Sequence, residues 1–104
     1  MKVTISKKAT YQINDSLEFL SRVSVQAATD LLEEIQISIK SLEFFPRAHA
    51  MLPNILIEGK EYRRMVLSSG RYGLIYSVET DEVYVMLFID FRRNNKILLN
   101  DLIS

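Results

Sequence analysis

The chain has 104 residues, of which 48% are hydrophobic and 25% charged, and its 13 basic and 13 acidic residues give a formal net charge of zero. This length and apolar content predict one globular domain over residues 1–104 and exclude a disordered or low-complexity chain. The sequence contains no cysteine, which excludes disulfides and thiolate metal sites and fits a reducing, cytoplasmic setting.

Charge and hydropathy also restrict the partners. Zero net charge excludes the overall basic bias that is typical of a dedicated nucleic-acid binder, so a phosphate-binding site would have to be a local patch. No stretch approaches the roughly 18 apolar residues that span a bilayer. The first ten residues are too polar for the core of a signal peptide. We therefore expect an intracellular chain that has no membrane partner.

The first half of the chain predicts a strand followed by two helices. Residues 2–7 alternate polar and apolar side chains, as a half-buried strand does. Over residues 8–22, and again over 24–45 with Ser24 as the N-cap, apolar residues recur at three- and four-residue spacing. The second helix is expected to end at Phe45, because the residue before a proline disfavours helical backbone. A very short link between the helices predicts an antiparallel hairpin.

The second half predicts a loop over residues 47–60, then strands over 62–67, 74–78 and 83–91 with short spacers that suit hairpins. The last strand is apolar on both faces apart from Asp90, which indicates a central strand. Asp90 is expected either to cap an arginine such as Arg92 or to face outward. The apolar tail, residues 96–104, is expected to dock on the core or to contribute to an interface. The order βααβββ predicts an α+β fold, with the two-helix antiparallel hairpin packed on one face of a mostly antiparallel sheet.

The order and spacing of these elements resemble the RelE/ParE toxin superfamily. The segment L-E-F-F-P ends the second helix, and Y-R-R-M-V-L, R-Y-G-L-I-Y-S-V and D-E-V-Y-V-M-L-F-I-D-F-R-R follow it. The likeness runs from Val3 to about Leu99. It implies the toxin component of a bacterial type II toxin–antitoxin system, a growth inhibitor that a cognate antitoxin neutralises.

The two branches of this superfamily imply different activities. RelE-like members cleave mRNA in the ribosomal A site without a metal, whereas ParE-like members are not nucleases and poison DNA gyrase. The long helix hairpin and the Phe-Pro at its end look more like ParE. Gyrase poisoning is therefore the leading hypothesis, a ribosome-dependent mRNA endoribonuclease is the alternative, and a non-toxic interaction module is the third. Whether the chain is an enzyme stays open, and no cofactor is implied.

The candidate site consists of arginines in the sheet half of the chain, namely Arg63, Arg64, Arg71, Arg92 and Arg93. A guanidinium stays charged and meets phosphate or carboxylate oxygens bidentately. If the chain is RelE-like, Arg64, Arg71 and Arg92 would form the catalytic group, and in either branch the five would contact the antitoxin or the target. Because neighbouring strand residues face opposite ways, only one of each adjacent pair can join a given face.

The sequence departs from the RelE-like pattern at two places. The resemblance places the strand arginine of RelE-like enzymes at Gly73, with Arg71 two residues upstream, and a second arginine at Arg92. A tyrosine that follows the second arginine in those enzymes has no counterpart in residues 94–99. Both departures disfavour RelE-type cleavage.

Other chemistry receives little support from the sequence. His49, the sole histidine, has no visible partner for a role as general acid. The strand tyrosines are expected to pack in the core or against a neighbouring strand, and they are Tyr62, Tyr72, Tyr76 and Tyr84. No pair of residues has the spacing of metal ligands, so no metal is expected.

Overall fold

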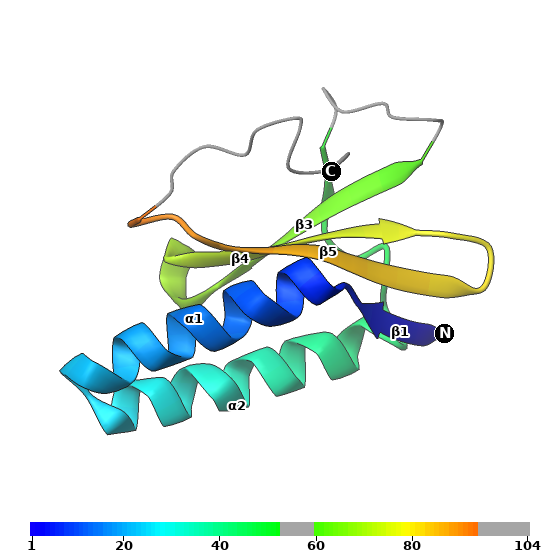
Figure 1. The fold of residues 1–104 in the computed structure, drawn as a ribbon. Coiled ribbons are helices and arrows are strands. Elements are labelled where there is room, and N and C mark those ends of the chain that lie inside the picture. Colours follow the sequence, from blue (N-terminus) through cyan, green and yellow to red (C-terminus); the bar gives the residue numbers. More distant parts are fainter. Residues whose placement is uncertain (53–59, 94–104) are drawn as a thin grey trace.

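The computed structural model describes residues 1–52 and 60–93, and Figure 1 shows their arrangement. The elements in chain order are β1 (Lys2–Ile5), α1 (Lys7–Val23), α2 (Val25–Leu42), β2 (Ala50–Met51), β3 (Glu61–Leu67), the short 3₁₀ turn η1 (Ser68–Gly70), β4 (Tyr72–Val78) and β5 (Glu82–Asp90). The strands form one five-stranded sheet in the order β1-β5-β4-β3-β2. The predicted α+β fold is confirmed.

The sheet is mostly antiparallel, as predicted, and only β1 runs parallel to its neighbour β5. β5 has a partner on both sides, which confirms it as an interior strand, while the middle strand is β4, all of whose residues are buried. The prediction of a loop throughout residues 47–60 is wrong at Ala50–Met51, which pair with β3. A two-residue strand is too short to show an alternation in the sequence. The rest of that loop, 53–59, and the apolar tail lie outside the described residues.

Ser24 joins the two helices and serves both of them. Its backbone N–H donates to the carbonyl of Leu20 at the end of α1, and its hydroxyl accepts a hydrogen bond from the N–H of Ala27, 3.1 Å away, at the start of α2. The predicted N-cap is therefore confirmed. α2 ends at Leu42, earlier than the predicted Phe45. The backbone tightens into a turn there, because the N–H of Glu43 donates to the carbonyl of Lys40, three residues back.

Replacing Ser24 with alanine should lower the free energy of unfolding by about 1 kcal/mol, since the first turn of α2 loses its side-chain acceptor. Urea denaturation followed by circular dichroism measures this change. Ser21→Ala is the matched control, because the Ser21 hydroxyl only donates back to a carbonyl of its own helix, that of Glu18. An equal loss in both variants would contradict the capping role.

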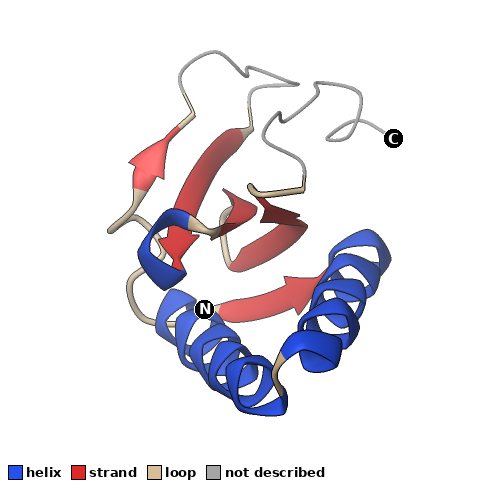
Figure 2. Ribbon diagram, turned by 90° about the vertical axis from the view of Figure 1, so that its left-hand side faces the viewer, coloured by secondary structure: helices blue, strands red, loops and turns tan. Residues whose placement is uncertain are grey.

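The two helices form a layer on one face of the sheet. Figure 1 shows them side by side, and the rotated view of Figure 2 shows β1 lying over the pair. A helix-side core fills the space between the layers and includes Leu31 and Leu42 of α2 and Leu74 and Tyr76 of β4. A second cluster lies on the opposite face of the sheet, and its buried members are Tyr62, Ile75, Leu87 and Ile89. The tyrosines at 62, 72 and 76 are buried, as predicted, whereas Tyr84 is only half-buried.

A bulge in β5 brings α1 against the end of that strand. The pairing register with β4 shifts between Ile75 and Tyr76, so that Met86 is the extra residue of β5. β1 ends at Ile5, so it does not pair with β5 at the bulge or beyond it. The side chains of Ser6, which caps α1, and of Gln12 bond the backbone of β5 there instead. The hydroxyl of Ser6 donates to the carbonyl of Met86, and the N–H of Phe88 donates to the side-chain oxygen of Gln12, each over 2.9 Å.

The turn between β3 and β4 is tied to α2. Ser68 has a φ of 50° and Gly70 a φ of 97°, so both use left-handed backbone. The N–H of Ser68 donates to the carboxylate of Glu34 over 2.8 Å, and its hydroxyl donates to the other oxygen of the same group. These bonds compensate for the unusual backbone of Ser68 and fix the turn that leads into Arg71.

Candidate functional site

The structure separates the five candidate arginines along the sheet, with Arg71, Arg92 and Arg93 at one end and with Arg63 and Arg64 further along β3. Burial, followed by the charge of Asp90, raises the pKa of Tyr72, and the charges of Arg71, Arg92 and Arg93 all act on this hydroxyl in the opposite direction. Tyr72 pairs with Asp90 in the β4–β5 ladder, so that Arg71, just before Tyr72, and Arg92 and Arg93, just after Asp90, lie at the same end of the sheet. Arg63 lies further along the sheet, where it pairs with Tyr76 in the β3–β4 ladder.

Arg63 is engaged within the protein. Its side chain is only 13% exposed, its Nε donates to the Glu61 carboxylate over 2.5 Å, and one of its Nη atoms donates to the carbonyl of His49 over 2.6 Å. The carboxylate of Glu61 also forms an ion pair with Arg47 at 3.3 Å. The hydrogen bond from Arg63 is the main reason why the pKa of Glu61 is lowered. These contacts fasten the segment before β2 to β3, and they leave Arg63 little freedom to meet a partner.

His49 and Tyr76 both lie beside Arg63, in the contacts that join the segment before β2 to the sheet. The Tyr76 hydroxyl donates to the carbonyl of Pro46 over 2.7 Å, and burial raises the pKa of Tyr76 to about 12. The ring of His49 stands edge-on to that of Tyr76, with ring centroids 6.5 Å apart. Burial, and then the charge of Arg63, lower the pKa of His49, which favours the neutral imidazole.

The raised pKa of Tyr76 predicts a loss of stability at high pH. Below pH 10 the phenol is protonated in both the folded and the unfolded chain, and the full stability is present. Between about pH 10 and 12 the unfolded chain ionises first, so the free energy of unfolding falls. Urea titrations across this pH range should show that the free energy of unfolding falls less steeply for Tyr76→Phe than for wild type. Equal slopes for the two proteins would contradict the raised pKa.

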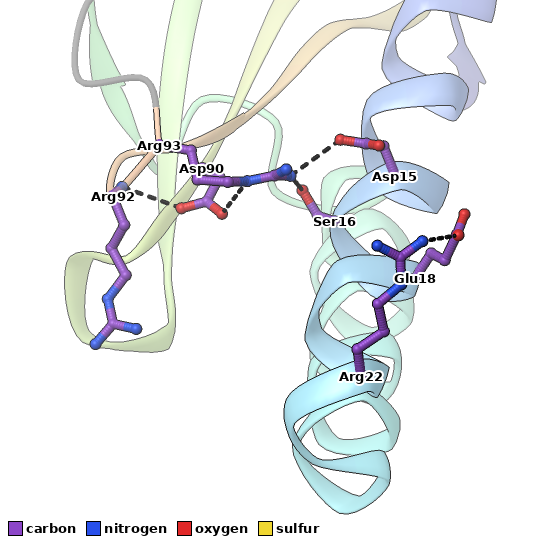
Figure 3. Close-up of polar contacts among 7 residues, drawn as sticks. All are labelled: Asp15, Ser16, Glu18, Arg22, Asp90, Arg92 and Arg93. Carbon is purple, nitrogen blue, oxygen red and sulfur yellow. Dashed lines mark hydrogen bonds and ion pairs between the residues drawn. The ribbon is translucent and has the colours of Figure 1, made fainter.

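Asp90 organises the residues at the end of β5. Its nearly buried carboxylate accepts a hydrogen bond from the backbone N–H of Arg92 and another from Nε of Arg93, each over 3.0 Å. The prediction that Asp90 caps an arginine is confirmed, but the side chain that it pairs with is that of Arg93, and Arg92 contributes only its backbone N–H. Figure 3 shows that the Arg93 side chain reaches across to α1, where its Nη2 lies 3.0 Å from Asp15 and 3.3 Å from the Ser16 hydroxyl.

Arg93 is stabilised as a cation in this position. Burial acts to lower its pKa, but the hydrogen bonds to Asp90 and Asp15 outweigh this effect, and the pKa of Arg93 is raised. The guanidinium also lies over the ring of Phe19, 4.6 Å from the centroid. Arg93 is therefore committed to contacts between β5 and α1.

The remaining arginines have no ion pair within the part of the chain that the structure describes. The Arg92 side chain points away from Arg93 and α1 (Figure 3), and only its backbone N–H meets Asp90. The guanidinium carbon of Arg71 lies 5.8 Å from the centroid of the Tyr72 ring, and its buried Nε has no hydrogen-bond partner there. Arg64 is exposed on the face of the sheet that points away from the helices. Among the described residues, these three cations are uncompensated and suit an anionic partner.

The position at which the resemblance places a RelE-like arginine is closed to a side chain. A Cβ added at Gly73 would lie 2.9 Å from two carbons of the Phe91 ring. Arg71 does not take over the place of that arginine along the strand, because its helical backbone (φ −77°, ψ −32°) interrupts the strand alternation. We did not identify Phe91 from the sequence, although a glycine within a strand often marks such a close approach.

The described ranges 1–52 and 60–93 contain neither a cluster of metal-ligand side chains nor a membrane-spanning helix. No three His, Asp or Glu side chains gather there where they could hold a metal ion. None of the helices in these ranges is long and apolar enough to cross a membrane.

Comparison with known proteins identifies the fold. No family model matches the sequence, and no curated protein matches it either. A chain in a solved structure described as the chromosomal ParDE TA system from P. aeruginosa superposes with a TM-score of 0.65 at 17% identity. The match covers 86% of this chain and 95% of the other. The protein therefore has the fold of the RelE/ParE toxins.

Proposed function

We propose that this protein is the growth-inhibiting toxin of a type II toxin–antitoxin system, that a cognate antitoxin neutralises it, and that it poisons DNA gyrase. The observation that carries the proposal is the likeness over 86% of the chain to a chain of a ParDE system. In this proposal residues 1–104 act as one cytoplasmic domain. Because one fold can host different activities, the choice of target rests on the site.

The site favours gyrase over mRNA as the target. A metal-independent ribonuclease must activate a ribose 2′-hydroxyl, stabilise a charged phosphorane and protonate the leaving oxygen. Phe91 covers Gly73, the position of the RelE-like strand arginine. The only histidine, His49, packs against Tyr76 beside Arg63. Beside Arg92, the Asp90 carboxylate already accepts from the N–H of Arg92 and from Nε of Arg93, and burial raises the pKa of the Tyr72 hydroxyl. Among the described residues, neither group is readily available for these two proton transfers.

The free arginines suit an acidic antitoxin segment. Arg64, Arg71 and Arg92 form no ion pair among the described residues, so carboxylates of a partner would compensate them at little cost to internal contacts. A segment that pairs with the arginines needed for toxicity would also block the target. This gives a direct mechanism of neutralisation.

The same three free cations would also suit an RNA phosphodiester, so the ribosome-dependent endoribonuclease is the second candidate. Induction of the chain without antitoxin separates the two. We expect growth arrest with relaxed or broken plasmid DNA, and intact mRNA by primer extension. New mRNA 5′ ends spaced within codons, lost when translation is blocked, would establish the nuclease instead. Unimpaired growth would leave only an interaction module.

A further inference from the structure

We propose that Asp15 of α1 and Asp90 of β5 hold Arg93 between them as a clamp, and that this clamp sets the direction in which Arg92 meets the target. Asp15, Asp90 and Arg93 are then positioning residues, and Arg92 is the contacting residue. The inference rests on the proposed function, because it assigns roles within the same site.

The first step is the turn that follows β5. One carboxylate, that of Asp90, accepts from the N–H of Arg92 and from the side chain of Arg93, while the N–H of Arg93 bonds the Asp90 carbonyl over 3.2 Å. The two arginines thus share a single anchor. With Arg93 held on the side of α1, Arg92 is directed to the other side, as Figure 3 shows.

The second step is the attachment of this turn to a rigid element. Arg93 meets Asp15 at 3.0 Å, the hydroxyl of Ser16 at 3.3 Å and the face of Phe19 at 4.6 Å, all within little more than one turn of α1. α1 is itself bound to β5 through Gln12. Asp90 holds the turn locally, and Asp15 fixes it to a second element. The loss of Asp15 should therefore widen the range of directions that the Arg92 side chain takes, and the loss of Asp90 should loosen the turn itself.

Asp15→Asn is the informative variant, because it weakens the ion pair between Arg93 and the more exposed of the two carboxylates. The Asp15 side chain is 48% exposed, so its neutralisation leaves no buried charge, and the unfolding midpoint should stay within about 4 °C of wild type. Glu18→Gln is the matched control. It removes the same charge from the same helix and breaks the exposed Glu18–Arg22 pair, which is 2.6 Å long and does not touch β5.

The functional arm measures inhibition of supercoiling by purified DNA gyrase. For Asp15→Asn we expect the half-inhibitory concentration to rise about threefold to tenfold, and for Glu18→Gln to change less than twofold. In an Arg92→Ala background, Asp15→Asn should add less than twofold, because the clamp acts through Arg92. Wild-type inhibition by Asp15→Asn, or an equal further loss in the Arg92→Ala background, would overturn the inference.

The structural arm needs no target. In ¹⁵N-labelled protein, the Nε–H of Arg93 and the backbone N–H of Arg92 should exchange slowly with solvent in wild type and in Glu18→Gln, and at least tenfold faster in Asp15→Asn. Unchanged exchange in Asp15→Asn would refute the clamp. If the wild-type chain does not inhibit gyrase, the proposed target fails, and exchange alone decides whether the clamp exists.

Discussion

Replacing Arg92 with glutamate should abolish growth inhibition and also weaken binding of the cognate antitoxin. The Arg92 guanidinium has no counter-ion among the described residues, and the Asp90 carboxylate fixes the Arg92 backbone through its N–H. A charged contact at the centre of an interface contributes on the order of 2 kcal/mol or more, which corresponds to roughly a 30-fold change in affinity. Growth after induction measures the first effect, and titration with the antitoxin from the same operon measures the second.

Arg22→Glu provides the control for this charge reversal. Arg22 carries the same charge but lies near the end of α1, where its side chain is 71% exposed and, among the described residues, pairs with Glu18 alone. This variant should keep its toxicity and its antitoxin affinity. Full retention of both activities by Arg92→Glu would show that Arg92 lies outside the functional surface.

Gly73→Arg, which restores the arginine of the RelE-like pattern, should destabilise the protein strongly. The new Cβ would lie 2.9 Å from the Phe91 ring, and 3.5 Å from the carbonyl oxygen of Met65. Overpacking costs about 1–3 kcal/mol, and a charge forced towards the apolar cluster around Ile75 and Leu87 adds to this. We expect a loss of about 3 kcal/mol or more in the free energy of unfolding, measured with urea.

The double variant Gly73→Arg/Phe91→Ala tests the cause of that loss. Without the Phe91 ring, Gly73→Arg should lower the free energy of unfolding by less than it does in the wild-type background. Phe91→Ala alone is itself expected to be destabilising. If the cost of Gly73→Arg is the same with and without the ring, Phe91 is not what closes this position.

The sequence was sufficient for the main elements of the fold because their periodicity is strong. Apolar spacing predicted both helices, and Ser24 predicted their junction. The run of apolar residues in β5 predicted an interior strand. The short β2 and the early end of α2 were not predicted. β2 depends on pairing with a distant residue, as Ala50 does with Arg64, and the end of α2 depends on a local tightening of the backbone at Glu43 that the apolar spacing does not show.

The sequence indicated candidate residues one by one but not how they are arranged, and their functional roles stay predictions. Asp90 stood out because a carboxylate is rare in an apolar strand, and its capping role followed from that. The separation of Arg63 from Arg93 depends on strand register and on salt bridges to Glu61 and Asp15, which no local pattern encodes. The bulge at Met86, which places α1 beside the end of β5, was equally invisible in the sequence.

The measurement that tests the central claim most directly combines the purified chain with DNA gyrase, relaxed plasmid and ATP. The account predicts that wild type blocks supercoiling and causes cleaved plasmid to accumulate, that Arg22→Glu does the same, and that Arg92→Glu does neither. Unimpaired supercoiling at every concentration of the wild-type chain, together with codon-spaced cleavage of mRNA on translating ribosomes, would contradict it.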